Sequence, residues 1–371
     1  MKSSSGHYFI GLDHIRAVAA LVVFIWHFNI HFGIGHQTPI YPLSILSEGH
    51  TGVALFMVLS GYLFAKLLEG RAIHYGAFFW NRFLRLAPLL FAVLLIYGVQ
   101  DAYRGEDVMA YVFKVLSGVV MPSLPHGGWS ITVEAHFYLL LPLLLALLRR
   151  KPAALFGVLV VAVAFRGVLY ASQGTIQIAS YLTIVGRIDQ FLLGILAYQY
   201  RDKLTGQHLK FAAVWALFLG FFWYFSSLGG FYQNGGYPSP SAIWIFVPLA
   251  EGVAYAFLVA WYDNSFKHTT GPISRFVAAI GTYSYSIYLL HFMVVGTLAR
   301  AVRQFVDVEN VLWSTALGSI CFLVMVPIGY LSFTYWEKPF LRFRKRYTIR
   351  RETESAEPAL TSTPATQKSA P

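Results

Sequence analysis

Charged side chains are scarce in this sequence, and cysteine is almost absent. Of the 371 residues, 12% are charged, 57% are hydrophobic and 17% are aromatic. A water-soluble domain usually carries about twice that share of charge. The low charge therefore excludes a soluble globular fold. The single cysteine, Cys321, excludes a disulfide framework and a metal site made of several thiolates, because both need more than one cysteine.

Long hydrophobic runs take the place of the missing charge. A helix needs about 20 mostly apolar residues to cross roughly 30 Å of hydrocarbon. The segment 108–120 is too short to cross, and 186–200 is short and charged at its start, so the count stays open between about nine and eleven. We predict an all-α, polytopic membrane protein with about ten transmembrane helices, near 10–31, 50–68, 86–103, 129–148, 153–171, 186–200, 209–228, 241–262, 277–300 and 311–336.

The basic residues are distributed unevenly between the two sides of this layout. Cytoplasmic loops of membrane proteins collect Lys and Arg, and 22 of the 28 basic residues fall in segments that are cytoplasmic if the N-terminus is inside. We therefore predict that both termini are cytoplasmic, and we read the net charge of +11 as this topological bias rather than as nucleic-acid binding. The remaining six lie in expected outer loops or at spans: Arg104, Lys114, Arg300, Arg303, Arg166 and Arg187.

The two ends of the chain carry different expectations. The first hydrophobic segment lacks an A-x-A-like cleavage site and contains Asp13, Arg16 and His27, so we expect it to stay in the protein rather than act as a cleaved signal peptide. Residues 1–345 are expected to form one transmembrane domain, followed by a basic and then disordered cytoplasmic tail at 346–371. The sequence shows no convincing internal repeat, P-loop or dinucleotide-binding fingerprint.

Ionisable residues inside spans are the first functional candidates, because each costs several kcal/mol in a membrane. Arg16 and His27 are eleven residues apart in the first span. That spacing is about three helical turns, or roughly 16 Å, so both side chains share one face. A lone membrane histidine often only hydrogen-bonds a neighbouring helix, but an arginine in register with it favours a functional pair.

Two further candidates involve charge at the ends of spans. Arg82 and Arg85 in NRFLRLAP are neighbours on one helix face, and two guanidinium groups suit a bidentate grip on phosphate; ordinary anchoring of topology is the alternative. Glu134 follows Ser130 by one turn and lies close to Trp129, at the expected outer start of the fourth span. A carboxylate before an apolar run indicates a functional site or a structural network.

Three other motifs carry weaker signals. In SGYLF, Ser60 and Tyr62 flank a glycine, and small residues let helices approach closely, so packing is the expected role. In GRIDQFLLG, Arg187 and Asp189 predict an internal ion pair. His291 follows several tyrosines in SYSIYLLHF, which favours either a gate or a hydrogen-bonded core.

Together these motifs resemble the membrane-bound acyltransferase-3 family, which acylates sugars and other hydroxyl-bearing acceptors. The resemblance covers about residues 8–345. It rests on the Arg-x10-His pair Arg16/His27, the Arg-x-x-Arg pair Arg82/Arg85, SGYLF, the WSxxxE segment 129–134, GRIDQFLLG, SYSIYLLH and the closing EKPF at 337–340.

The resemblance implies an integral inner-membrane O-acyltransferase. In the family, the counterparts of Arg16, His27, Arg82 and Arg85 are tied to activity and to handling of the acyl donor. It implies acyl-CoA, with acetyl-CoA as the default, as the donor substrate, and no metal. Where the family commonly has two acidic residues after WSxxx, this chain has Glu134-Ala135, which weakens any role that needs both.

The expected mechanism joins the donor side to the acceptor side. Donor phosphates would bind Arg82 and Arg85 at the cytoplasmic face, and His27 would act as general base on an acceptor hydroxyl. Glu134 would orient the imidazole or stabilise its cation, as a carboxylate does in a catalytic triad. A covalent acyl-serine or acyl-histidine route stays open.

The expected partners are membrane lipids and a carbohydrate or glycolipid acceptor. Many family members carry a fused extracytoplasmic hydrolase-like domain. Only the basic tail at 346–371 is expected after the last span here, so we expect this protein to act alone or with a separate extracytoplasmic partner. A transporter or flippase is the alternative function, because intramembrane His, Glu and Arg residues also build transport pathways. A lipid-linked-sugar glycosyltransferase fits less well, because the expected outer loops offer no spaced acidic pair.

Overall fold

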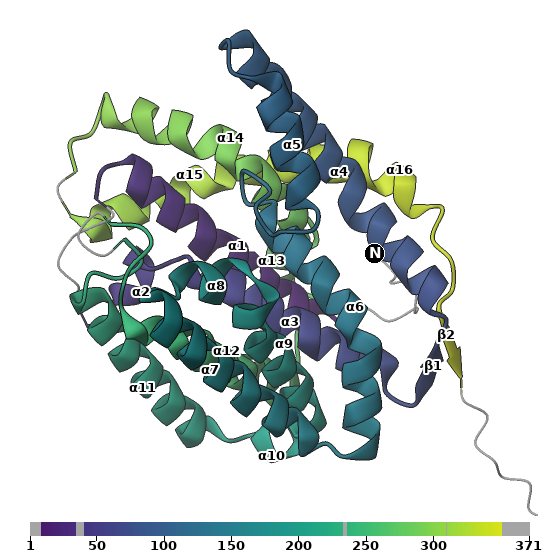
Figure 1. Ribbon diagram of the computed structural model, residues 1–371. Coiled ribbons are helices and arrows are strands. Elements are labelled where there is room, and N and C mark those ends of the chain that lie inside the picture. Colours follow the sequence, from purple (N-terminus) through teal and green to yellow (C-terminus); the bar gives the residue numbers. More distant parts are fainter. Residues whose placement is uncertain (1–8, 35–40, 233–235, 309, 351–371) are drawn as a thin grey trace, which may run out of the picture.

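The computed structural model describes residues 9–34, 41–232, 236–308 and 310–350. These residues form an almost entirely helical protein with one two-stranded sheet (Figure 1). The elements in chain order are α1 (Ile10–His31), α2 (Ser44–Ser47), α3 (Thr51–Leu68), β1 (Arg71–Ile73), α4 (Tyr75–Tyr103), α5 (Val108–Gly118), α6 (Trp129–Arg150), α7 (Ala154–Gln173), α8 (Gln177–Leu182), α9 (Ile184–Gln199), α10 (Arg201–Leu204), α11 (His208–Ser227), η2 (Ala242–Ile245), α12 (Val247–Ser265), α13 (Pro272–Thr282), α14 (Ser284–Arg303), α15 (Val311–Leu331), η3 (Ser332–Glu337), α16 (Lys338–Leu341) and β2 (Thr348–Arg350).

The expected all-α membrane architecture is confirmed, although the number of crossings is not. Among the described residues, eight helical segments are long and apolar enough to span a membrane: α1, α3, α4, α6, α7, α11, α14 and the continuous run Val311–Leu341. The other two expected spans correspond to α9, which has 16 residues, and α12, which has 19. Ten crossings therefore remain a prediction that depends on these two helices.

Two helix boundaries differ from the expected ones. α4 begins at Tyr75 rather than near residue 86, so Arg82 and Arg85 lie inside a helix and not in the loop before it. The expected helix 277–300 is divided at Tyr283 into α13 and α14. At the first of these places Arg82 and Arg85 interrupt the apolar run in the sequence, but both are partly buried inside the protein.

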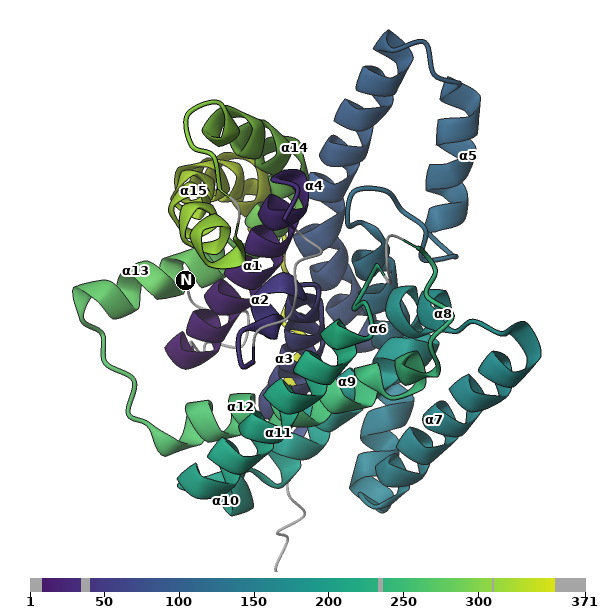
Figure 2. The same ribbon diagram turned by 90° about the vertical axis from the view of Figure 1, so that its left-hand side faces the viewer.

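Helices α1, α3, α9 and α12 pack together at the centre of the protein (Figures 1 and 2). The closest approach is between α3 and α9. A Cβ atom at Gly61 would overlap the Phe191 carbonyl, and one at Gly194 would overlap the Val58 carbonyl. The glycine of SGYLF thus has the packing role expected of it, because only a residue without a side chain allows the two backbones to approach so closely.

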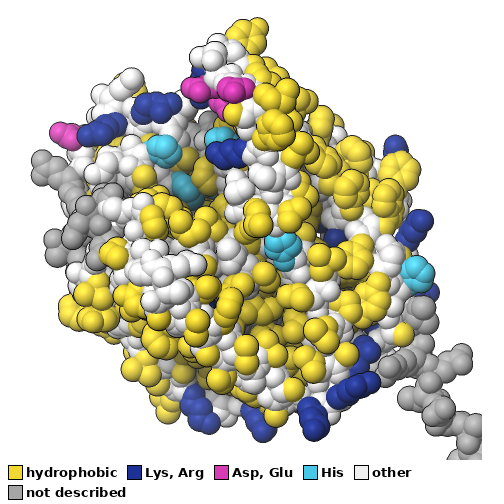
Figure 3. Space-filling model, in the orientation of Figure 1, with side chains coloured by type: hydrophobic (Ala, Val, Ile, Leu, Met, Phe, Trp, Pro, Cys, Tyr) yellow, Lys and Arg dark blue, Asp and Glu magenta, His cyan; other side chains and the backbone are white. Residues whose placement is uncertain are grey.

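The remaining helices surround this centre unevenly. α14 and α15 lie on one side of α1, whereas α7 and α11 lie on the side of α9 (Figure 2). The α4–α5 hairpin projects beyond the other helices (Figures 1 and 2). On the face in Figure 3, hydrophobic side chains cover the middle of the molecule, and Lys and Arg side chains gather along the lower edge. This distribution suits a protein surrounded by lipid.

The sheet ties the last described residues to the start of α4. β1 and β2 are antiparallel, with Arg71 opposite Arg350 and Ile73 opposite Thr348. Residues 346–350, where the expected tail begins, therefore pack against the helical domain. The rest of the expected disordered tail, 351–371, lies outside the described residues.

Candidate functional site

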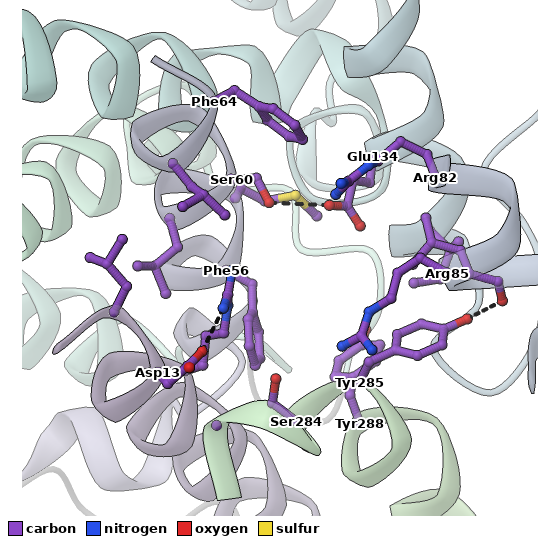
Figure 4. A pocket seen from close by; sticks show the side chains of 18 of the residues that line it. Asp13, Phe56, Ser60, Phe64, Arg82, Arg85, Glu134, Ser284, Tyr285 and Tyr288 are labelled. Carbon is purple, nitrogen blue, oxygen red and sulfur yellow. Dashed lines mark hydrogen bonds and ion pairs between the residues drawn. The ribbon is translucent and has the colours of Figure 1, made fainter. Parts of the chain in front are cut away.

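A cavity of about 280 Å³ lies between several helices (Figure 4). We call it the central cavity. It is bounded by α1, α3, α4, α6, α13 and α14, with further contributions from η3 and the segment after α16. Its polar and charged lining side chains are Asp13, Arg16, Ser60, Arg82, Arg85, Ser130, Glu134, Tyr138, Thr282, Ser284, Tyr285, Tyr288 and Arg344.

Positive charge predominates in this lining. Four arginines, Arg16, Arg82, Arg85 and Arg344, face two carboxylates, Asp13 and Glu134. Arg16 forms a short ion pair with Asp13, with Nη1 and Oδ1 2.6 Å apart. The structure thus brings three of the predicted arginines into one cavity and adds a fourth, Arg344, which the sequence reasoning missed. A cavity with this charge suits an anionic ligand.

The two arginines of the Arg-x-x-Arg motif have different surroundings. Arg85 Nη1 donates to Glu337 Oε2 at 2.9 Å, and the Glu337 side chain is only 1% exposed. Glu337 also accepts a hydrogen bond from Ser286. Arg82 instead lies between two rings, with Cζ 5.3 Å from the Phe64 centroid and 5.7 Å from that of Phe78.

Glu134 forms its hydrogen bonds within the cavity. It accepts from Ser60 at 3.1 Å and from Tyr138 one turn further along α6, and its carboxylate points toward Arg82 in Figure 4. Ser60 is in the middle of α3, so the Glu134 carboxylate lies level with the middle of that helix, although Glu134 itself is only in the second turn of α6. Its position near the outer end of the span stays a prediction.

His27 lies outside the central cavity and pairs with a second predicted residue, His291. His27 Nδ1 is 2.9 Å from the Val23 carbonyl and 3.3 Å from His291 Nε2. His291 Nδ1 is 2.6 Å from the Tyr288 carbonyl. Because a carbonyl only accepts, these contacts are satisfied when Nδ1 carries the proton in both rings, and the Nδ1–H of His27 is then shared between the Val23 carbonyl and His291 Nε2. This pattern leaves Nε2 of His27 unprotonated.

Tyr288 connects the two regions. It lines the central cavity, and its ring centroid is 5.9 Å from that of His291. Its hydroxyl lies 2.9 Å from Ser130 Oγ and donates to the Gly127 carbonyl at 3.2 Å. Ser130, predicted as a site residue, therefore holds Tyr288 at the boundary between the cavity and the histidine pair.

The pairing expected within GRIDQFLLG is wrong. Asp189 pairs with Arg166 of α7, through two hydrogen bonds of 3.1 and 2.6 Å, and both side chains are fully buried. Arg187 pairs instead with Glu251 of α12 at 3.2 Å. Residues two apart on a helix point in different directions, so each of the two finds its partner on another helix.

Two other predicted residues have structural contacts away from the cavity. The Trp129 ring lies 5.8 Å from the Arg187 guanidinium, which makes it a packing neighbour of that ion pair. Tyr62 donates to Asp263 at 2.7 Å, and Lys66 pairs with the same carboxylate. These contacts join α3 to α12.

Polar residues that the sequence reasoning did not select include Glu337, Glu251 and Arg344. EKPF was recognised only as a motif, and its glutamate proves to be the buried partner of Arg85. Within the described ranges there is no group of three or more His, Cys, Asp or Glu residues with a geometry that could hold a metal ion.

Residues 9–330 match the family described as an acyltransferase domain, the acyltransferase-3 family. The chain belongs to this family. The match covers every α-helix that bounds the central cavity, and it includes all of the predicted site residues. It ends before Glu337 and Arg344. The identification as an acyltransferase-3 protein is therefore independent of the charged residues that follow α15.

Curated relatives of this acyltransferase-3 protein carry O-acetyltransferase names. "O-acetyltransferase OatA" of Staphylococcus aureus (strain MRSA252) is 25% identical, over 94% of this chain and 62% of its own length. "Putative peptidoglycan O-acetyltransferase YrhL" of Bacillus subtilis (strain 168) is 26% identical, over 95% of this chain and 59% of its own. A "Putative O-acetyltransferase" of Staphylococcus aureus (strain COL) is 26% identical, over 79% and 52%. The chain thus spans about half to three fifths of the length of these relatives. No solved structure matches it.

Proposed function

We propose that this protein is an integral inner-membrane O-acyltransferase. It takes an acyl group, acetyl by default, from cytoplasmic acyl-CoA and transfers it to a hydroxyl of a cell-surface glycan or lipid-linked sugar on the outer side. The family match and the O-acetyltransferase names of the relatives support the reaction class. The donor, the direction of transfer and the roles of individual residues are our proposal.

The observation that carries the proposal is the position of the cationic cavity beside the histidine pair. Arg82 and Arg85 line the cavity near the start of α4, which follows a segment expected to be cytoplasmic. Arg16 and His27 lie on one unbroken helix, α1, and are separated by roughly 16 Å along its axis. A donor whose phosphates bind among the arginines can therefore extend its acyl arm along α1, past Tyr288, to the level of His27.

The hydrogen bonds of His27 suit the role of general base. Its free Nε2 accepts the proton of the acceptor hydroxyl as the hydroxyl oxygen attacks the thioester carbonyl. The tetrahedral intermediate then expels the CoA thiolate, which takes up the proton from His27, and the acyl group remains on the acceptor oxygen. His291 fixes the tautomer and the ring orientation of His27 throughout.

The structure favours a different role for Glu134 from the one expected. Among the described residues, its hydrogen-bond partners are Ser60 and Tyr138, and the imidazole of His27 is held by Val23 and His291. We therefore propose that Glu134 organises the cavity wall next to Arg82, and that the second histidine orients the base.

A biochemical assay distinguishes this function from transport. Purified protein would be incubated with radiolabelled acetyl-CoA and a soluble glycan fragment, and release of CoA and label in the glycan would be measured. If the protein transfers the acyl group, CoA release and label in the glycan should be equal in amount, and both should depend on the acceptor. Movement of a substrate across proteoliposomes without CoA release would instead support the transporter alternative and exclude the acyltransferase mechanism.

The acceptor can be sought in the producing cell. Mass spectrometry of the surface glycans of a deletion strain is expected to show the loss of an acyl mass, which is recovered when the intact gene is returned. A strain carrying the His27→Ala variant serves as the matched control, because it makes the protein without the proposed base.

A further inference from the structure

Three buried polar atoms, one on α4 and two on the segment after α16, have no hydrogen-bond partner among the described residues. They are Arg82 Nε, Arg344 Nε and the Tyr347 hydroxyl. A buried donor without a partner costs about 1–3 kcal/mol, and more when it is charged, so such groups are rare unless they serve a ligand or water. The two arginine nitrogens can only donate, so their missing partner is an acceptor, and the Tyr347 hydroxyl can donate to the same acceptor.

The three donors lie close to one another. Arg82 and Arg344 both line the central cavity. The Phe78 ring lies beside both Arg82 and Tyr347, because its centroid is 5.7 Å from Arg82 Cζ and 5.7 Å from the Tyr347 ring centroid. Burial, together with the positive charges of Arg85 and then Arg82, lowers the pKa of Arg344 to about 10. Positive charge is thus brought together here with too little negative charge to balance it.

The segment that carries Arg344 is fixed on both sides of it. Asn81 of α4 donates to the Lys345 carbonyl at 2.7 Å and accepts from the Lys345 N–H at 2.8 Å. Trp80 Nε1 donates to the Phe343 carbonyl at 3.2 Å. The β1–β2 pairing then holds the residues that follow Tyr347. These contacts hold the backbone on either side of Arg344 against the first turns of α4, where its side chain lines the same cavity as Arg82.

Arg85 is less available than its motif suggests. Its Nη1 is bound to the buried Glu337, and its Nη2 is 3.5 Å from the Thr282 carbonyl. The ion pair neutralises the charge of Arg85 and fixes its direction. The motif arginine that keeps an unpaired buried donor is Arg82.

We infer that Arg82 and Arg344, with the Tyr347 hydroxyl as a third donor, form the binding site for a phosphoryl group of the acyl donor. This inference rests on the proposed function, and it replaces the Arg82/Arg85 pair by a pair made from α4 and the segment after α16. Two guanidinium groups and one hydroxyl match the several acceptor oxygens of a phosphate ester. The family match ends at residue 330, so it assigns no role to Arg344 or Tyr347.

The test is a binding titration of the purified full chain in detergent. CoA and dephospho-CoA, which lacks the 3′-phosphate, would be titrated into the wild type and into the variants Arg344→Gln, Arg344→Lys and Tyr347→Phe. Arg342→Gln is the matched control, because Arg342 carries the same charge on the same segment but is exposed. Thermal unfolding of each variant shows whether it is folded. A parallel titration with phosphatidylglycerol tests whether a lipid headgroup takes the site.

We expect Arg344→Gln to weaken CoA binding at least tenfold, as an order-of-magnitude figure for a lost charge-assisted hydrogen bond. Arg344→Lys should recover part of the loss, and Arg342→Gln should change binding by less than about twofold. An equal loss for CoA and dephospho-CoA places the diphosphate in the site, and a loss for CoA alone places the 3′-phosphate there; either result supports the inference.

Other outcomes overturn it in distinguishable ways. If the wild type binds CoA and the folded Arg344→Gln and Arg344→Lys proteins bind it equally well, the site is wrong while the proposed function stands. If the wild type does not bind CoA, the proposed donor is wrong. Binding of phosphatidylglycerol that depends on Arg344, in the absence of CoA binding, would make the site one for a lipid phosphate and would contradict its assignment to the donor.

Discussion

His27 Nδ1 and His291 Nε2 lie 3.3 Å apart, although the two residues are separated by 264 positions in the chain. One comes from α1 and the other from α14. Because His291 Nδ1 is committed to the Tyr288 carbonyl, the contact leads to a single arrangement of protons in which His27 Nε2 is free. We propose that His291 orients His27 as a carboxylate orients the histidine of a catalytic triad.

Replacing His27 is expected to remove nearly all acyl transfer. General-base catalysis contributes about 10²–10⁴-fold, so turnover by His27→Ala should fall at least 100-fold, while CoA binding stays close to that of the wild type. The measurement is acceptor-dependent CoA release under saturating donor. His208→Ala, at an exposed position, is the control. A His27→Ala protein that keeps more than about a tenth of wild-type turnover would show that another group is the base.

The Arg85–Glu337 pair is expected to stabilise the folded protein. Breaking a buried ion pair by removing one partner costs about 3–5 kcal/mol, because the other charge is left uncompensated. Glu337 is 1% exposed and Arg85 22%, so Arg85→Gln should lower the thermal unfolding temperature clearly, with a cost toward the lower end of that range. In the double variant Arg85→Gln/Glu337→Gln most of the loss should be recovered. Additive losses in a double-mutant cycle would contradict the coupling.

The Arg166–Asp189 pair gives a purely structural prediction. Both side chains have an exposed fraction of 0%, so Asp189→Asn should destabilise the protein by about 3–5 kcal/mol. The loss would be measured as a fall in the unfolding temperature of the purified protein. Asp202→Asn, whose side chain is 91% exposed, should have no measurable effect. Equal unfolding temperatures for Asp189→Asn and wild type would mean that the backbone carbonyls around Arg166 are sufficient to hold its charge.

The helices were predictable from the sequence because their signal is local. α1, α6 and α7 begin within about one residue of their expected starts, since about 20 apolar residues are required of any span. The start of α4 was missed because Arg82 and Arg85 look like loop residues when their partners are unknown. Arginine is itself a good helix former. In this apolar segment the guanidinium groups of Arg85 and Arg82 are partly buried beside Glu337 and Phe64, and the sequence does not show that these partners lie nearby.

The candidate site was predictable only in part for the same reason. Arg16, Arg82, Arg85 and Glu134 were selected because charge in an apolar segment is itself a local signal. The residues that join them in the cavity were not selected. Arg344, for example, lies in the basic stretch RFRKR, where nothing in the sequence distinguishes it from the other basic residues. The pairing of Arg166 with Asp189 and of Arg187 with Glu251 depends on how α7, α9 and α12 pack, and no spacing along the chain records that.

Glu48 is expected to make the stability of the protein depend on pH. Its carboxyl group lies between α2 and α3, outside the spans, and burial raises its pKa to about 8, although hydrogen bonds from the Phe231 N–H and from Ser226 act in the opposite direction. Burial, with the charge of Arg187, lowers the pKa of the neighbouring His50 well below its usual range. This shift favours the neutral form of His50.

The sign follows from the raised pKa of Glu48. Between the pKa of about 4.5 in the unfolded chain and about 8 in the folded protein, only the unfolded chain gives up its proton, so stability is lost as the pH rises through this window. Glu48→Gln cannot ionise, and its unfolding temperature should exceed that of the wild type by a margin that grows from about pH 5 to about pH 8. Glu106→Gln, at an exposed position, should follow the wild type. A constant difference at every pH would contradict titration of Glu48.

The orientation of the protein in the membrane is expected to follow its basic residues. With 22 of 28 Lys and Arg residues in the segments assigned to the inside, a reporter fused at 149–151 or at Arg351 should be cytoplasmic, and the uncharged segment 229–240 should be outside.

Residues 233–235 of that segment lie outside the described residues, but Tyr237 is described and 45% exposed. In a protein with Cys321→Ser, we therefore expect Tyr237→Cys to react with a membrane-impermeant maleimide in intact cells, and Lys203→Cys, at an exposed position, to react only after the cells are opened. The same orientation puts Arg82 on the side of cytoplasmic acyl-CoA. Protection of Tyr237→Cys together with labelling of Lys203→Cys in intact cells would reverse the topology, and with it the direction of acyl transfer.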